Sequence, residues 1–79
     1  MKLPRDMTGV QLSKGLAHFG YAVTRQAGSH MRLTTQQRGE HHITIPAHKP
    51  VRVGTLNAII TDVADHMGIS KDDVISAIL

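Results

Sequence analysis

One apolar stripe of helical period, near the carboxyl end of the chain, constrains the fold more than any other feature. Apolar residues recur there at intervals of three and four: Leu56, Ile59, Ile60, Val63, Ala64 and Met67. Such a stripe is typical of an amphipathic helix that buries one face. We expect Thr55 to be the N-cap of this helix and Gly68 to end it. Because the chain has only 79 residues, we expect one small domain, 1–79, to supply everything that covers the stripe.

Two further helices are expected, one on each side of this pattern. Near the amino end, Thr8 and Gln11 have the spacing of a capping box, and Gly20 is suited to end the helix. The core face of this helix consists of Leu12, Leu16 and Phe19. After Gly68, the spacing of Ser70 and Asp73 predicts the cap of a short last helix. Its expected buried face consists of Val74, Ile75, Ile78 and Leu79.

Three strands are expected between the first two helices. Residues 21–26 alternate Tyr21 and Val23 with Ala22 and Thr24, as a half-buried strand does. Two more strands are expected over 30–35 and 41–45, with turns at 27–29 and 36–39. The order helix, three strands, helix, short helix predicts an α+β fold in which the helices cover one face of a three-stranded antiparallel sheet.

The second face of this sheet is expected to be open. Met31, Leu33, Ile43 and Ile45 have the parity of residues that point to the helices. The opposite parity sends polar side chains outward: His30, Arg32, Thr34, His42 and Thr44. We therefore expect function to lie on a polar, basic face that carries histidines.

Charge is distributed unevenly along the chain. Residues 1–55 carry eight Lys and Arg against Asp6 and Glu40, a net charge of +6, whereas residues 56–79 have a net charge of −3. This asymmetry is typical of a protein whose basic part meets a polyanion, most simply nucleic acid. An ordinary solvated surface is the alternative, and charge alone does not decide between the two.

Composition excludes several classes of protein. The absence of cysteine excludes disulfides, a thiol nucleophile and every zinc site that needs sulfur, and it fits a reducing compartment, so we expect a cytoplasmic location. No apolar run approaches the roughly 20 residues of a membrane span, and the first residues do not resemble a signal peptide. We expect a soluble, unprocessed chain with no membrane association.

Six histidines raise the possibility of a metal site, but their placement argues against one. His41 and His42 are adjacent on a strand and project to opposite faces, and only His30 and His42 share a face. A two-metal nuclease needs several convergent carboxylates, and the basic part of the chain offers only Asp6 and Glu40. We expect no metal and no cofactor.

His30 is the candidate catalytic residue. It begins a strand directly after Gly28 and Ser29, where a glycine lets the backbone turn and a substrate approach. Imidazole, whose ordinary pKa is about 6.5, exchanges protons near neutral pH, as cleavage of RNA through its own 2′-hydroxyl requires. Arg32 on the same face is suited to hold a phosphate. A solvated or structural role is the alternative for His30, and it is the role expected of His18, His41, His48 and His66.

Recognition of nucleic acid through shape and phosphates is favoured over base stacking. The chain has only two aromatic residues, Phe19 and Tyr21, and both are expected to be buried. Lys49 and Arg52 precede the helix expected to open at Thr55, whose first N–H groups would suit a phosphate. The alternative is a basic loop without a ligand.

The sequence resembles the HicA (YcfA-like) toxins over nearly its whole length. The resemblance rests on Leu3-Pro4, Phe19-Gly20-Tyr21, Arg25-Gln26-Ala27-Gly28-Ser29-His30, Ile43-Thr44-Ile45-Pro46-Ala47-His48 and Gly54-Thr55-Leu56, in this order and spacing. It implies a double-stranded-RNA-binding-like fold, mRNA-cleaving toxin activity, a catalytic role for His30 and a HicB-type antitoxin partner. The chain departs from the family where the turn Gln36-Gln37-Arg38-Gly39 lacks the usual Pro-Asp-Gly type, and where Met31 follows the histidine instead of a bulkier or β-branched residue.

Beyond His30, the resemblance assigns no residue. From position and charge we expect RNA contacts from Arg25, Ser29, Arg32, Lys49, Arg52 and Thr55. The leading hypothesis is a metal-independent endoribonuclease of a type II toxin–antitoxin pair. A non-catalytic RNA-binding module of the same fold and a protein-interaction domain are the alternatives.

Overall fold

The computed structural model describes residues 3–79 and has the expected order of elements. Helix α1 (Gly9–Leu16) continues into a 3-10 turn, η1 (Ala17–Phe19), and three strands follow: β1 (Ala22–Ala27), β2 (His30–Thr35) and β3 (His41–Pro46). The long helix α2 (Val53–Met67) and the short helix α3 (Lys71–Ile78) come last. No helix among these residues is long and apolar enough to cross a membrane.

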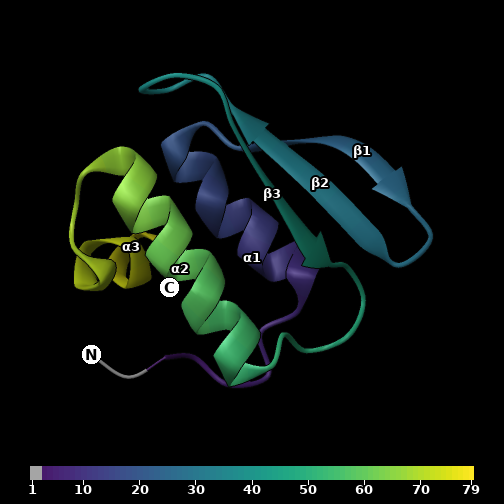
Figure 1. Ribbon diagram of the computed structural model, residues 1–79. Helices are drawn as coiled ribbons and strands as arrows, with labels where there is room; N and C mark the ends of the chain where they lie inside the picture. Colours follow the sequence, from purple (N-terminus) through teal and green to yellow (C-terminus); the bar gives the residue numbers. More distant parts are fainter. Residues whose placement is uncertain (1–2) are drawn as a thin grey trace.

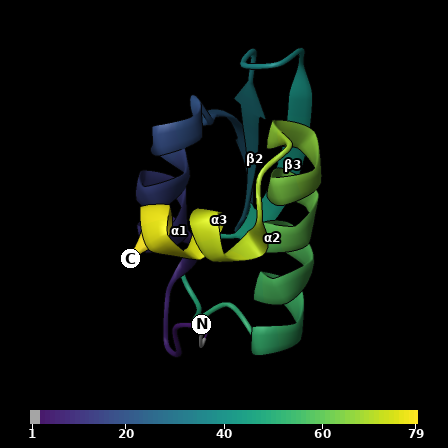
Figure 2. The same ribbon diagram turned by 90° about the vertical axis from the view of Figure 1, so that its left-hand side faces the viewer.

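The strands form one antiparallel sheet in the order β1-β2-β3. Helices α1 and α2 cover one face of this sheet (Figure 1). Figure 2 shows α3 crossing α1 and α2 on the side that faces away from the sheet. The predicted α+β fold, with helices on one face and an open second face, is therefore confirmed.

Local signals in the sequence account for most helix ends. Thr8 and Gln11 form the predicted capping box at the start of α1, and Gly20 ends the η1 turn with a left-handed φ of 78°. Gly68 ends α2 in the same conformation, and the hydroxyl of Ser70 accepts a hydrogen bond from the Asp73 N–H at the start of α3. These four boundaries are fixed by capping chemistry that the sequence displays directly.

The core lies between the sheet and the helices. All six residues of the apolar stripe on α2 are buried, as predicted. The four strand residues expected to point toward the helices are buried as well: Met31, Leu33, Ile43 and Ile45. Burial of one large apolar side chain stabilises the folded state by about 1.5–3 kcal/mol. This layer is therefore the main source of stability.

The prediction of a half-buried first strand is wrong. Tyr21, just before β1, is 2% exposed, but every residue of β1 is exposed, and Val23 is 46% exposed. Figure 1 shows β1 at the edge of the sheet, on the side away from α2. No helix packs beneath Val23 closely enough to bury it, so its alternating pattern does not correspond to a buried face.

Two further expectations are wrong at helix ends. Arg52, not Thr55, is the N-cap of α2, because the N–H of Val51 is held by the Met7 carbonyl at 2.7 Å and the chain turns into the helix directly afterwards. Leu79 lies beyond the last turn of α3 and is 70% exposed, so it does not extend the buried face.

Candidate functional site

The open face of the sheet carries the polar side chains predicted for it. They are exposed or half-buried: His30, Arg32, Thr34, His42 and Thr44. Antiparallel pairing arranges them in rows, with His30 opposite Pro46 and Arg32 opposite Thr44. Rows two residues apart lie roughly 7 Å from each other along the strands. The row of Arg32 is therefore the immediate neighbour of the row of His30.

A bulge in β1 brings a second arginine to this face. The register shifts between Val23 and Arg25, so Arg25 lies directly opposite Arg32. Thr24, the extra residue, also faces this side, since its hydroxyl lies 2.9 Å from the Thr34 hydroxyl. Within residues 3–79 neither guanidinium forms an ion pair. Like charges directly opposite each other are unfavourable in a sheet, and a bound anion would relieve their repulsion.

His30 lines a pocket between the β1–β2 turn and the loop after β3. The pocket has a volume of about 290 Å³ and is lined by Ser29, His30, Pro46, His48 and Lys49. The Ala47 N–H donates to the Ser29 carbonyl at 2.7 Å, which ties the two segments together. The Ser29 hydroxyl lies 3.5 Å from Nδ1 of His30, at the limit of hydrogen-bonding distance.

This pocket brings together three of the residues expected to contact RNA or act on it, Ser29, His30 and Lys49. It also contains His48, for which the sequence indicated only a structural or solvated role. The signal that would have found His48 is the pairing of β2 with β3. Because His30 lies opposite Pro46, a residue two positions further along lies close to the start of β2.

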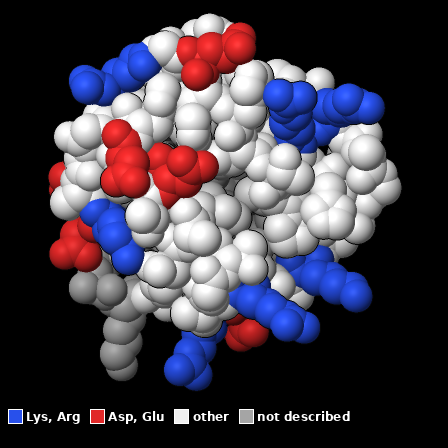
Figure 3. Space-filling view, viewed as in Figure 1, with Lys and Arg blue, Asp and Glu red and all other residues white. Residues whose placement is uncertain are grey.

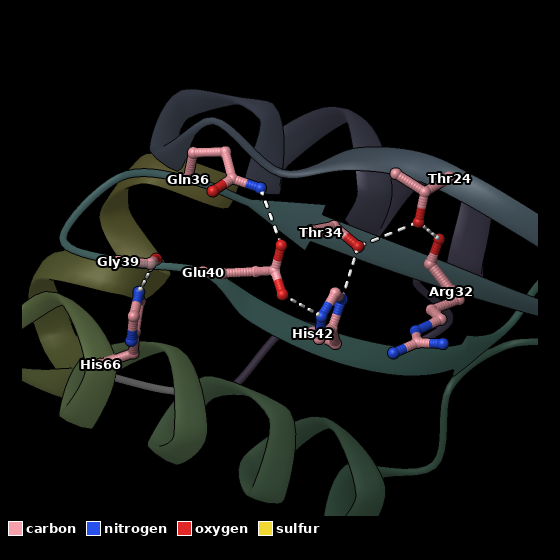
Figure 4. Close-up of polar contacts among 8 residues, drawn as sticks. All are labelled: Thr24, Arg32, Thr34, Gln36, Gly39, Glu40, His42 and His66. Carbon is pink, nitrogen blue, oxygen red and sulfur yellow. Dashed lines mark hydrogen bonds and ion pairs between the residues drawn. The ribbon is translucent and has the colours of Figure 1, made fainter.

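His42, the other histidine of the open face, is held by protein groups at both ring nitrogens. Its Nδ1 lies 2.7 Å from the Thr34 hydroxyl, and its Nε2 donates to the Glu40 carboxylate at 3.1 Å (Figure 4). The pKa of Glu40 is lowered by the hydrogen bond from Gln36, then by His42, and more weakly by the charge of Arg32. His42 therefore belongs to a polar network on the open face of the sheet in which both of its ring nitrogens have protein partners.

His41 and His66 form a second engaged pair, at the edge of the core. Their rings stack with centroids 4.4 Å apart. Nε2 of His41 donates to the Asp62 carboxylate at 3.2 Å, so its Nδ1 accepts the Tyr21 hydroxyl proton at 2.8 Å. Nε2 of His66 lies 2.9 Å from the carbonyl of Gln37. Burial, followed by the charge of Asp62, raises the pKa of Tyr21 to about 12.

The three residues expected to bind a phosphate near the start of α2 lie in different places. Arg52 lines a second pocket of about 340 Å³ together with Arg5, Asp6, Pro50, Val51 and Val53, at the start of α2. Lys49 lines the His30 pocket instead, and Thr55 is exposed in the first turn of α2 without lining either pocket. The expected cluster of Lys49, Arg52 and Thr55 is thus split. Arg5, which the sequence did not single out, stands beside Arg52.

Charges of opposite sign occupy different parts of the surface. Figure 3 shows acidic side chains gathered over α2, whereas most Lys and Arg side chains lie toward the sheet and along the edge below it. The four aspartates of residues 56–79 account for the negative charge of that segment. The basic sheet side is therefore the part of the molecule suited to a polyanion.

Comparison with known protein families decides which proteins this chain is related to. A family model described as HicA toxin of bacterial toxin-antitoxin matches residues 10–64. The chain belongs to the HicA toxin family. The matched span runs from α1 into α2 and includes His30, His48 and both open-face arginines. No curated protein and no solved structure matches the chain. As a HicA-family toxin, the protein has an antitoxin as its partner.

In this HicA toxin, the candidate site contains histidines and cationic side chains. His30, His48 and Lys49 line one pocket, and Arg25 and Arg32 lie one row away in the sheet. Among residues 3–79, no three His, Cys, Asp or Glu side chains gather as a metal site would require. Such a set of groups is suited to binding a phosphodiester and moving protons around it.

Proposed function

We propose that the protein is a metal-independent endoribonuclease that cleaves mRNA, with His30 as a general acid or base. The observation that carries the proposal is the position of His30. It borders a pocket, lies one row from two opposed arginines, and has only the Ser29 hydroxyl near Nδ1 at 3.5 Å among residues 3–79. An imidazole with little protein bonding is available to a substrate, unlike those of His41, His42 and His66.

The chemistry that this arrangement supports is transesterification by the RNA itself. The 2′-hydroxyl loses its proton to a base, O2′ forms a bond to phosphorus, and the bond from phosphorus to O5′ breaks as O5′ takes up a proton. Negative charge grows on the non-bridging oxygens, where Arg25 and Arg32 would stabilise it. The products are a 2′,3′-cyclic phosphate and a free 5′-hydroxyl, and no metal takes part.

The carboxylates of the basic part of the chain lie away from His30, which favours a mechanism without metal. Glu40 is bonded to Gln36 and His42, near the other end of β2, and Asp6 lines the second pocket. A two-metal mechanism needs several carboxylates around one phosphate. Neither of these carboxylates lines the pocket of His30.

The RNA backbone is proposed to continue from the His30 pocket toward the start of α2. Ser29 and Lys49 would contact the scissile phosphate region, and Arg52, with Thr55 in the first turn of α2, would hold a phosphate further along the strand. Arg52 offers no side-chain oxygen to cap the first N–H groups of the helix, which leaves them free to face an anion. An mRNA substrate implies a cytoplasmic location.

The antitoxin is proposed to be of the HicB type and to cover the open face of the sheet. The active groups lie on an exposed basic surface, so a protein that binds there with an acidic patch would block the substrate directly. Hydrogen exchange of the purified complex should show protection of β1 and β2, including His30 and Arg32. Protection confined to the acidic surface of α2 and α3 would contradict occlusion.

Cleavage of RNA by the purified protein tests the proposed function. Wild-type protein should cleave mRNA at the same rate with and without a chelator, and His30→Ala should remove the cleavage. Activity lost with chelator and restored by Mg²⁺ would contradict the metal-free mechanism. RNA binding without cleavage would favour the non-catalytic RNA-binding module, and the absence of both would favour a protein-interaction domain.

A further inference from the structure

The pocket that contains His30 holds a second histidine, His48, from a different segment of the chain. His30 is the first residue of β2, and His48 lies in the loop after β3. Both residues line the same pocket of about 290 Å³, and Lys49 lines it as well. This volume is close to the lower end of small-ligand pockets, roughly 300–1,000 Å³. A single phosphodiester would therefore lie near both rings.

The loop that carries His48 is fixed by three contacts. The Ala47 N–H donates to the Ser29 carbonyl at 2.7 Å, and the Ala47 carbonyl accepts the Val10 N–H at 3.2 Å. Helix α1 also packs directly on this segment, since a Cβ added at Gly9 would stand 1.6 Å from the carbonyl oxygen of Pro46. Ala47 itself is fully buried. His48 is thus presented from a rigid backbone at a fixed place relative to His30.

The two rings in the pocket also differ from the other histidines by their lack of protein partners. His41, His42 and His66 each form hydrogen bonds through their rings to side chains or carbonyls. Within residues 3–79, His48 forms no hydrogen bond or ion pair, and His30 has only the contact of 3.5 Å with the Ser29 hydroxyl. The rigid position of His48 is therefore not explained by bonds that its own ring makes.

We propose that His48 is the second proton-transfer group of the cleavage reaction, paired with His30. One imidazole takes the proton from the 2′-hydroxyl as O2′ bonds to phosphorus. The other, in its imidazolium form, gives a proton to O5′ as the bond from phosphorus to O5′ breaks. The protein thus gains one proton and loses one, and solvent restores the starting forms after the products leave. In-line displacement places O2′ and O5′ on opposite sides of phosphorus, so the base at O2′ and the acid at O5′ are two separate groups.

This inference rests on the proposed ribonuclease function. The first arm of the test compares His30→Ala, His48→Ala and His18→Ala on one RNA substrate. His48→Ala should lower the cleavage rate by roughly 10²- to 10⁴-fold, in the range expected for a general acid or base. His18→Ala is the matched control, because His18 is also an exposed histidine and lies in η1, at the far end of β2 from His30. His18→Ala should cleave like wild type, and thermal melting should show all three variants folded.

The second arm replaces the leaving group. An oligoribonucleotide with sulfur in place of the bridging 5′-oxygen at the mapped cleavage position needs no proton on departure, because a thiolate is a good leaving group. The variant that lacks the acid should regain cleavage of this substrate, and the variant that lacks the base should not. Recovery in one of His30→Ala and His48→Ala, but not in the other, supports the pair and says which ring is the acid.

The outcomes separate the inference from the function on which it rests. If His30→Ala is inactive and His48→Ala cleaves at the wild-type rate, the ribonuclease stands and the role of His48 is refuted. Recovery of both variants, or of neither, on the sulfur substrate also refutes the pair. If wild-type protein does not cleave RNA at all, the proposed function and the inference fail together.

Discussion

At one end of β2 the rings of His41 and His66 stack on each other and bond to protein atoms, whereas at the other end His30 and His48 border an open pocket. The residue type is the same, but the surroundings differ. At the first end the rings satisfy the buried Tyr21 hydroxyl and the carbonyl of Gln37. At the second, the backbone is fixed and the rings are left to solvent.

The difference shows how the two kinds of histidine can be told apart. A ring whose nitrogens already have partners stabilises the fold, and it cannot exchange protons with a substrate without breaking those bonds. A ring with few partners on a rigid backbone adds little to stability and keeps its proton available. Each of the mutations below disturbs one end of β2, and the measurements show whether stability or RNA cleavage changes.

The largest effect is expected from Gly9→Ala, which disturbs the end of β2 where His30 and His48 line the pocket. The new Cβ would stand 1.6 Å from the Pro46 carbonyl oxygen, so α1 or the loop with His48 must move. We expect a loss of about 3 kcal/mol in the free energy of unfolding, and a fall in RNA cleavage under conditions where the variant is folded. Urea denaturation and a cleavage assay measure the two effects.

Gly54→Ala is the matched control for stability. A Cβ at this helical position meets nothing within 4 Å, so the change should leave stability unaltered or raise it by about 0.5–1 kcal/mol. Equal destabilisation by both substitutions would show that the close packing of α1 on Pro46 is not the cause.

His41→Ala disturbs the opposite end of β2, where His41 stacks on His66. It removes the acceptor for the buried Tyr21 hydroxyl and the partner of Asp62, so unfolding should become easier by about 1–3 kcal/mol. RNA cleavage per folded molecule should stay at the wild-type rate. A loss of cleavage without a loss of stability would assign His41 to the chemistry and contradict the comparison.

The titration of Tyr21 at high pH tests the packing around His41. Its pKa is raised to about 12 in the folded protein, and the ordinary value is 10.0, so the folded state keeps its proton after the unfolded state has lost it. This contribution to stability is complete below about pH 10 and is lost as the pH rises toward 12. Because Tyr21 is the only tyrosine, the ultraviolet absorbance of tyrosinate follows it directly. A folded-state midpoint near 10 would contradict its burial against His41.

The smallest effect is expected in the salt dependence of RNA binding. Lys49→Ala and Arg52→Ala should each lower the slope of log affinity against log salt by about one phosphate contact. Arg38→Ala is the control, since Arg38 lies in the β2–β3 turn against Gly68, at the end away from His30. An equal change for Arg38 would mean that RNA does not distinguish the two ends.

The residues that define the fold could be recognised in the sequence, whereas part of the site could not. Thr8, Gly20 and Gly68 act through local capping chemistry, and the stripe on α2 acts through its period, so both are visible without a structure. The position of His30 beside Arg32 follows from strand parity. Such features depend only on residues close together in the chain.

Features that depend on tertiary contacts were missed. The bulge that turns Arg25 toward Arg32 has no glycine or other local signal, and the exposure of Val23 depends on where the helices lie. Thr55 was expected to begin α2, but the bond between Val51 and Met7, far apart in sequence, sets the start of the helix. The sequence indicates only a structural or solvated role for His48, because its nearness to His30 requires the register of β2 with β3.

The most direct test of the comparison measures cleavage rate and unfolding midpoint for His30→Ala and His41→Ala side by side. We predict that His30→Ala loses cleavage by roughly 10²- to 10⁴-fold and keeps the wild-type midpoint, because its ring is exposed and has few partners. His41→Ala should show the reverse. If His30→Ala cleaves like wild type, or if it loses stability as His41→Ala does, then His30 is a structural residue and the assignment of the active site is wrong.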